Sequence, residues 1–381
     1  MNDAAETTPP RRMQGADRRG AALSIHGVSR FAAQNVLLVG LIGLSIFFGF
    51  KSPQFWTLTN IRSIGLTSAV LAIVAVAEAL LILSGYVDLS IGSVLGLGGV
   101  VAGLLTVNHH AAPVIAVGVA LLVGAGIGAV NGWLCTYLGL SPLLVTLGAL
   151  TAVRGATLLV TSLPVFGFGT AFDSLGVGTI AGIPVPVVIA AAIFAIGALY
   201  LGLTPGGRHV YAIGVNPEAA YLSGIQIKRL PFTLFVLCGA AAALGGVLFA
   251  ARLDSAPPGT LGVGFELSVL TAVLLGGVAF EGGRGNMIGV LLGVLFLGVL
   301  QNGLTLLNVT DFWQQVANGV ALVVAAGLSV LSTRASGALG GGRKNRTEVG
   351  STPSLADNTF GSGAMDPASS VTTVGGATTN G

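Results

Sequence analysis

Hydrophobic residues dominate the chain in long runs that are bounded by short polar or glycine-rich stretches. A helix that spans a bilayer needs about 20 apolar residues, and roughly 17 to 25 are tolerated. By that rule we predict ten spanning helices, of which the first and the eighth are short. They cover residues 35–50, 63–84, 89–107, 112–134, 143–163, 184–203, 231–252, 266–280, 287–307 and 312–333.

Three segments interrupt or flank this pattern. Residues 1–34 carry several arginines and lack the apolar core and cleavage site of a secretory signal, which predicts a disordered cytoplasmic tail. Residues 335–381 are rich in Gly, Ser and Thr and have too few large apolar side chains to form a core, which predicts a second disordered tail. Between them lies a membrane domain, residues 35–334, whose longest interruption is a polar loop, residues 204–230.

The composition agrees with an all-α polytopic membrane protein. Of 381 residues, 53% are hydrophobic and only 8% are charged, against roughly a quarter in a soluble domain. The 59 glycines favour close packing of helices, because small residues let helix backbones approach each other in lipid. Gly92, Gly96, Gly99, Gly124 and Gly128 are examples.

Several other site types are excluded. The formal net charge is +3, but the basic residues form no stripe that would suit nucleic acid. Cys135 and Cys238 lie in apolar runs without metal-ligand spacing, so neither a disulfide framework nor a metal site is predicted. Residues 282–286, GGRGN, lack the Lys and Ser or Thr of a phosphate-binding loop, which favours a tight turn.

The distribution of basic residues predicts the orientation. If the chain starts in the cytoplasm, ten crossings return it there and place the polar loop and both termini inside. Most of the 17 Lys and Arg residues then lie inside, as the positive-inside rule requires. A shift by one helix would move the basic residues of the polar loop outside.

An internal repeat is a second expectation. Asn131 and Gly132 precede a polar turn, and Asn302 and Gly303 precede another. With ten helices, the first turn is cytoplasmic and the second is external. The second to fifth helices would then recur, inverted, as the seventh to tenth, and such repeats place a substrate path between two halves.

The polar loop contains the signature of a short helix. Asn216 suits an N-cap, Pro217 suits the first turn, Glu218 complements the helix dipole, and Gly224 suits the end. On these residues alone, a helix that docks on a partner and an ordinary loop helix without one are equally good interpretations.

Several motifs resemble one family. In the polar loop, Glu218, Ala219, Ala220 and Gly224 resemble the cytoplasmic EAA-type loop of ABC importer permeases. Longer stretches resemble ribose-type sugar permeases of the branched-chain amino acid and sugar permease superfamily, and the resemblance covers about residues 50–333. These stretches are SGYVDLSIGS (84–93), PLLVTLG (142–148), GRHVYAIG (207–214), FEL (265–267), GGRG (282–285) and NGL (302–304). Tyr86, where the family usually has Gly, and the early Pro231 depart from the pattern.

The resemblance implies a non-catalytic permease subunit in a bacterial inner membrane. Its partners would be an ABC ATPase subunit, an extracytoplasmic sugar-binding protein and a second permease subunit, in a homodimer or a heterodimer. ATP and Mg would be used by the ATPase, and this chain would bind no cofactor. The substrate would be a monosaccharide similar to ribose, xylose or arabinose. The coupling residues would be Gly214, Asn216, Glu218, Ala219, Ala220 and Gly224.

Ionisable residues at membrane depth are costly and are functional candidates by default. Glu78, Asp88, Arg154 and Glu266 have this setting, and each could equally be structural. Asp88 fits the N-cap region of a helix that starts at Leu89. By residue type, the candidates for a translocation path are Asp88, Asn131, Thr146, Gln301 and Asn302. Lys51 and Arg62 on the external face are candidates for docking the binding protein.

Two other classes stay open. An ion-coupled secondary transporter would need an acid inside the bundle, and Glu78 is the claimant. A branched-chain amino acid permease of the ABC type would share the loop and the topology. A membrane-embedded enzyme would need a clustered nucleophile, base or metal, and no such cluster is visible in the sequence.

Overall fold

The computed structural model describes residues 36–341. The predicted N-terminal tail and residues 342–381 of the predicted C-terminal tail lie outside the described residues. The chain divides into two units, residues 1–333 and 334–381.

Helices make up nearly all of the regular structure. They are α2 (Val36–Lys51), α3 (Leu58–Leu83), α4 (Ile91–Val107), α5 (Pro113–Thr136), α6 (Pro142–Val160), α7 (Thr170–Gly176), α8 (Val185–Leu203), α9 (Pro205–Val215), α10 (Pro217–Leu222), α11 (Arg229–Leu253), α12 (Phe265–Leu275), α13 (Met287–Leu306) and α14 (Asp311–Gly341). Within residues 36–341, four two-residue strands form two antiparallel pairs. β1 (Val165–Phe166) pairs with β4 (Ser255–Ala256), and β2 (Thr179–Ile180) pairs with β3 (Ile183–Pro184).

Each of the ten predicted apolar segments coincides with one helix, so the helical prediction is confirmed. In the described part, α3, α5, α6, α8, α11 and α13 are long and apolar enough to cross a membrane, and α2, α4 and α12 are shorter apolar helices. The protein is therefore a multi-pass membrane protein of mainly helical structure. Ten crossings and the side of each terminus remain predictions.

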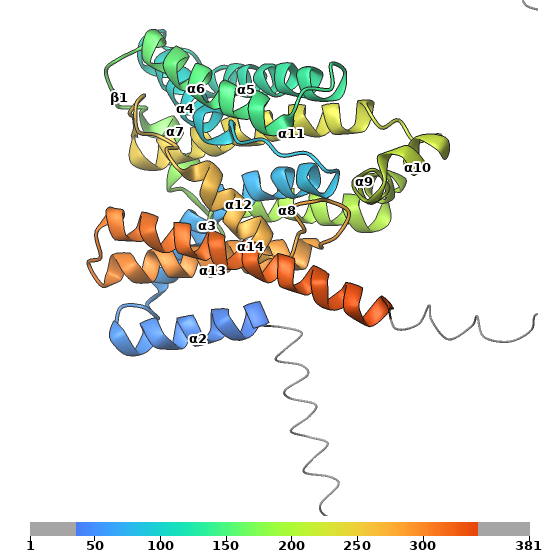
Figure 1. Cartoon of the computed structure of the whole chain (residues 1–381). Helices are drawn as coiled ribbons and strands as arrows, with labels where there is room; N and C mark the ends of the chain where they lie inside the picture. Colours follow the sequence, from blue (N-terminus) through green and yellow to red (C-terminus); the bar gives the residue numbers. More distant parts are fainter. Residues whose placement is uncertain (1–35, 342–381) are drawn as a thin grey trace, which may run out of the picture. The chain divides into compact units, whose positions relative to one another are not determined.

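The centre of the fold is α3. In its most apolar window 89% of the residues are buried inside the chain, against 11% for α6, so α6 leaves most of its surface to lipid or to a partner. α3 contacts α8, α11, α12 and α13. In Figure 1, α9 and α10 lie on the opposite side of the helices from β1 and α7.

Glycine faces allow the closest helix pairs to form. A Cβ at Gly124 or Gly128 of α5 would collide with the backbone carbonyls of Gly239 or Phe235 of α11. Gly99 of α4 meets α11 in the same way. The packing role predicted for these glycines is confirmed, and it follows from the absence of a side chain between the two backbones.

Two non-helical segments interrupt the bundle, residues 84–90 between α3 and α4 and residues 254–264, which include β4, between α11 and α12. The carbonyls of Leu261 and Gly262 lie against Gly96 and Gly92 of α4, and Leu261 is buried. Irregular backbone inside a membrane bundle is tolerated where protein covers it or where it lines a cavity. These two segments are therefore candidates for a functional site.

The helix contacts follow a twofold pattern. α5 packs on α11 and α4, and α13 packs on α3 and α12. The pair α4 and α11 is matched by the pair α12 and α3. If α3 to α6 correspond to α11 to α14, each of these contacts has a counterpart in the other half. This is the pattern that the predicted repeat requires.

Candidate functional sites

The polar loop folds as its capping residues predict. α10 begins at Pro217, and the Asn216 side chain accepts a hydrogen bond from the Ala219 amide at 3.0 Å. Glu218 lies in the first turn. After the helix, Gly224 takes φ +80, a left-handed conformation that glycine adopts without steric cost. The predicted short helix is confirmed.

One face of this loop is open and the other is packed. Val215, Tyr221 and Leu222 are exposed, the last by 82%, whereas Ala220 is buried. Exposed apolar residues on a short capped helix are typical of an interaction surface. A cavity of about 460 Å³ lies beside it. Its lining consists of Gly206, His209, Gly224, Ile225, Gln226, Arg229, Leu230 and Thr233.

α9 connects this surface to the bundle. A Cβ at Gly214 would collide with the Leu83 carbonyl and with Gly283, so only glycine allows this approach. The Gly283 amide donates to the Leu83 carbonyl at 2.9 Å, and the Tyr211 hydroxyl donates to the Gly285 carbonyl at 2.7 Å. Burial raises the pKa of Tyr211. α9 therefore contacts both the end of α3 and the turn at residues 282–285 directly.

That turn has the predicted tight geometry. Gly282, Gly283 and Gly285 all have positive φ, and the Ala279 amide donates to the Arg284 carbonyl at 2.9 Å.

A buried network joins the segment 84–90 to three helices. Glu78 Oε1 accepts the Asp88 amide at 3.0 Å, and Glu78 Oε2 accepts from Cys238 Sγ at 3.1 Å. Asp88 Oδ1 accepts the Ser90 amide at 2.8 Å and the Ser90 hydroxyl at 2.6 Å. The Asn131 amide donates to Ser90 Oγ at 3.0 Å.

No buried side-chain nitrogen or oxygen of this network lacks a partner. Asp88 accepts from the backbone just ahead of the helix, close to the predicted capping role, but α4 begins at Ile91 and not at Leu89. No group of His, Cys, Asp and Glu in the described residues could hold a metal ion. Satisfied buried networks rigidify a core, so the network holds α3, α5 and α11 around the segment 84–90.

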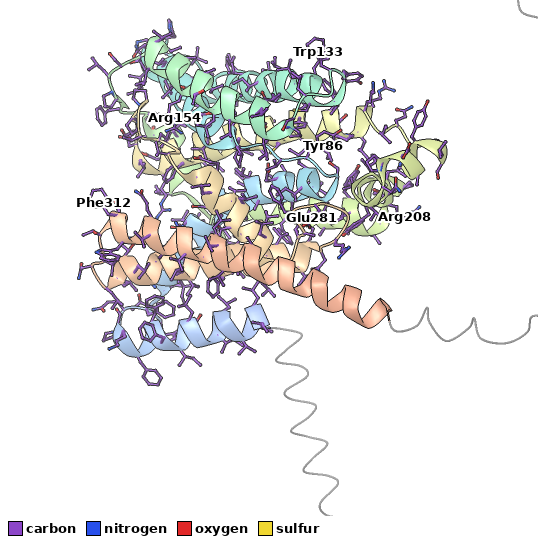
Figure 2. All side chains as sticks on the ribbon, viewed as in Figure 1. Tyr86, Trp133, Arg154, Arg208, Glu281 and Phe312 are labelled. Atoms are coloured by element: carbon purple, nitrogen blue, oxygen red, sulfur yellow. The ribbon has the colours of Figure 1, made fainter. Side chains whose placement is uncertain are left out.

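Glu266 has different surroundings. It lies in the first turn of α12, and its carboxylate lies against Gly92 of α4. Glu266 Oε2 is buried and has no hydrogen-bond partner among the described residues. The carboxylate accepts hydrogen bonds from the backbone amides of Glu266 and Gly264, and Arg154 of α6 attracts it electrostatically. In Figure 2, Arg154 lies toward the β1 and α7 end, away from Arg208 on α9.

The remaining path candidates lie in other parts of the fold. Thr146 of α6 is fully buried and donates to the Pro142 carbonyl of its own helix at 2.8 Å. Asn302 of α13 donates to Asn60 Oδ1 at 2.9 Å, and its own Oδ1 has no partner within residues 36–341. Gln301 is half-buried. Asn60 and Glu78 stand on one helix about 27 Å apart at 1.5 Å per residue. The fold thus joins Asp88 to Asn131 through Ser90 and keeps Asn302 apart.

The two candidate docking residues lie near each other in the chain. Lys51 ends α2 and Arg62 follows the start of α3, and both are exposed. The Arg62 guanidinium lies beside Gly182 in the β2–β3 turn.

Sequence reasoning missed Ser90, Cys238 and Asn60, which complete these hydrogen bonds. Cys238 is 160 residues from Glu78, and an isolated cysteine in an apolar run carries no local signal of a polar partner. Ser90 lies in the quoted motif SGYVDLSIGS, and its distance of two residues from Asp88 was the available signal.

Comparison with known proteins identifies the family of this chain. The family model described as branched-chain amino acid transport system, permease component, matches residues 60–326. The chain belongs to that permease family. The ribose import permease protein RbsC of Escherichia coli K12 is 38% identical over 293 residues, 76% of this chain and 91% of the relative.

Other members of the family are similar over comparable lengths. RbsC of Bacillus subtilis 168 is 38% identical over 75% of this chain and 89% of the relative. The L-arabinose transport system permease protein AraH of Escherichia coli K12 is 34% identical over 80% of this chain and 93% of the relative. No solved structure gives a significant match to this permease.

Proposed function

We propose that this chain is the transmembrane permease subunit of an ATP-driven ABC importer for a monosaccharide. The observation that carries the proposal is similarity, over nearly their full length, to permeases named for ribose and L-arabinose. The substrate is a ribose-, xylose- or arabinose-like sugar, delivered by an extracytoplasmic binding protein. The chain lies in a bacterial inner membrane with ten crossings and with both termini in the cytoplasm.

The permease has no catalytic role in this scheme. It binds no cofactor, and a separate ATPase subunit uses ATP and Mg. α10 docks on that subunit through Glu218 and Ala219, which are exposed, whereas Ala220, the third residue of the motif, is buried and packs the helix onto the chain. The exposed Tyr221 and Leu222 support this assignment, because exposed apolar side chains on a capped helix are stabilised when a partner protein buries them.

Closure of the ATPase pair would move α10 and α9 together. The contacts of Gly214 with Leu83 and Gly283 then pass that movement to α3 and to the turn before α13. α3 is the most buried long helix, so its displacement changes the bundle as a whole.

The path runs between two permease subunits, in a homodimer or a heterodimer, each built from two inverted halves. The exchangeable contacts of α5 with α11 and of α13 with α3 support the repeat. Asp88, Asn131, Thr146, Gln301 and Asn302 are its candidate polar groups. Lys51 and Arg62 receive the binding protein on the outer face.

Import of a branched-chain amino acid is the second candidate, because the family description names that substrate. Ion-coupled transport through Glu78 is the third. Its carboxylate already accepts from Asp88 and Cys238, which supports a structural role instead.

One experiment separates the three. The tagged permease is purified from its own organism, all co-purifying chains are identified by mass, and uptake of radiolabelled D-ribose, L-arabinose and L-leucine is measured in cells. We expect an ATPase and a binding protein, with sugar uptake that stops on ATP depletion. Leucine uptake alone would establish the second candidate, and sugar uptake that persists on an ion gradient would establish the third.

A further inference from the structure

Tyr211 of α9 is a residue that the proposed function leaves without a role. Its side chain is half-buried, and its hydroxyl donates to the Gly285 carbonyl at 2.7 Å. Gly285 lies in the turn before α13, 74 positions further along the chain. The hydroxyl therefore links α9 to a distant part of the permease.

The turn before α13 fits between the end of α9 and the end of α3. A Cβ at Gly283 would collide with Val215, the last residue of α9. The Gly283 amide donates to the Leu83 carbonyl at 2.9 Å. A Cβ at Gly282 would press on the backbone of Gly85, just after α3. Three segments that are distant in the sequence thus meet at one junction.

We call residues 83–85, 211–215 and 282–285 the α9 junction. Most of its contacts are steric and join backbone to backbone, as at Gly214. Among the described residues, the bond of Tyr211 is the only side-chain hydrogen bond that joins two of the three segments. Figure 2 shows Arg208 of α9 and Glu281 beside the turn on the same side of the helices.

Steric contact and hydrogen bonding transmit movement differently. Atoms in contact resist compression strongly, whereas the attraction between a single pair of them is tiny. The contacts of Gly214 therefore push the turn when α9 moves toward it, and they hold it only weakly when α9 moves away. A hydrogen bond is directional and resists separation. The Tyr211 hydroxyl is thus the group that can pull the turn back with α9.

The junction leads to two parts of the bundle. Segment 84–90 follows α3 and holds Asp88, which bonds to Ser90 and, through its amide, to Glu78. The turn leads into α13, which Asn286 caps. In the predicted repeat, α3 and α13 belong to different halves. One displacement of α9 can therefore act on both halves.

We infer that Tyr211 is a positioning residue for coupling, whose hydroxyl fastens the turn before α13 to α9 so that this turn follows α9 in both directions of the transport cycle. This inference rests on the proposed ATP-driven sugar import and adds to it the link that acts on the return movement. Tyr211 neither docks the ATPase nor contacts the sugar in this scheme. Without its hydroxyl, ATP hydrolysis continues but moves fewer sugars.

The test uses the complete importer in proteoliposomes with its sugar-loaded binding protein. Uptake of radiolabelled D-ribose, L-arabinose and D-allose and hydrolysis of ATP are measured on the same vesicles, first for the unchanged protein. Tyr211→Phe removes only the hydroxyl. Tyr200→Phe of α8 is the matched control, because Tyr200 is also half-buried. Its hydroxyl lies over Gly206 and forms no hydrogen bond with the residues that the structure describes.

We expect Tyr211→Phe to lower the number of sugars moved per ATP about fivefold, since loss of one hydrogen bond shifts an equilibrium by a factor of this size. ATP hydrolysis, co-purification of the ATPase and the thermal unfolding midpoint should match those of Tyr200→Phe. An unchanged ratio of sugar to ATP overturns the inference. Loss of assembly, or a parallel fall in uptake and hydrolysis, also overturns it, because that is the pattern of a structural role.

Amide hydrogen exchange of the purified importer, followed by mass spectrometry, is the second readout. The amides of residues 282–285 should exchange faster in Tyr211→Phe than in the unchanged protein or in Tyr200→Phe, because a released turn opens more often. Equal exchange in all three proteins shows that the hydroxyl does not fasten the turn, and the inference fails. If the unchanged importer takes up none of the three sugars, or takes them up without hydrolysing ATP, the proposed function itself fails.

Discussion

Glu78 of α3 and Glu266 of α12 are both acidic residues in apolar helices, and their carboxylates have different surroundings. Both oxygens of Glu78 accept hydrogen bonds, from Asp88 at 3.0 Å and from Cys238 at 3.1 Å. One oxygen of Glu266 is buried without a partner among the described residues. Burial of a polar group costs free energy unless a hydrogen bond compensates. The two acids therefore differ in their hydrogen-bond partners and not only in their burial.

The two regions also differ in what encloses them. The Glu78 network lies against α3 and α11, the two most buried long helices. Arg154, the neighbour of Glu266, stands on the least buried one. A polar group at the centre of one chain can be satisfied only by that chain, whereas one at its margin can meet a second subunit or a substrate.

Among the variants that test this comparison, Glu78→Ala should change the free energy of unfolding most. It removes the acceptor of the Asp88 amide and of Cys238 and leaves a cavity in the core. We expect a loss of about 3 kcal/mol or more in the free energy of unfolding, measured by urea or thermal unfolding of the purified permease in detergent. Glu281→Ala is the exposed control. A stable Glu78→Ala variant would show that the network is not structural.

Ser90→Ala tests the same network at its centre. The Ser90 hydroxyl donates to Asp88 and accepts from Asn131, so its removal leaves the Asn131 amide without this acceptor. We expect a loss of about 1 to 3 kcal/mol in the same unfolding assay. Ser223→Ala, at an exposed hydroxyl that bonds only within the polar loop, should cost less. Equal losses in the two variants would contradict the central position of Ser90.

Asn216→Ala extends the comparison to the surface of the protein. The Asn216 side chain has its hydrogen-bond partner, whereas α10, the helix that it caps, exposes apolar side chains. Loss of the cap should destabilise α10 by about 1 kcal/mol and weaken ATPase co-purification. Asn286→Ala is a matched control, since the Asn286 side chain caps α13 by accepting the Gly289 amide at 2.8 Å. A similar loss of ATPase from both variants would argue against docking at α10.

The smallest effect is expected for Cys238→Ser. The serine hydroxyl can still donate to Glu78, so the network keeps its hydrogen bonds. We expect a change within about 1 kcal/mol in the free energy of unfolding. Cys238→Val, which has no donor, is the comparison variant and should lose more. If Ser and Val were equivalent at this position, the Cys238 bond would contribute nothing.

The elements of the fold were predictable because their causes are local. An apolar run of sufficient length becomes a helix, and each of the ten runs did so. The short helix α10 was predictable from Asn216, Pro217 and Gly224 for the same reason. The start of α4 was misplaced by two residues, because Asp88 bonds to the Ser90 amide ahead of the helix instead of capping a helix from Leu89.

The candidate site was less predictable. Residue type selected Asp88 and Asn131, and the structure joins them through Ser90. Residue type also selected Asn302, which bonds to Asn60 near the other end of α3. No local pattern pairs residues that are 41, 160 or 242 positions apart.

By itself, the sequence determined a helical membrane protein, the positions of its helices, a capped polar helix, and motifs of a permease family. Only the tertiary structure decided which intramembrane acid is satisfied and which is not. The physical reason is the distance along the chain over which each interaction acts. Hydrophobic length and helix capping act within a few residues, whereas the partner of a buried carboxylate depends on which distant helices pack against it.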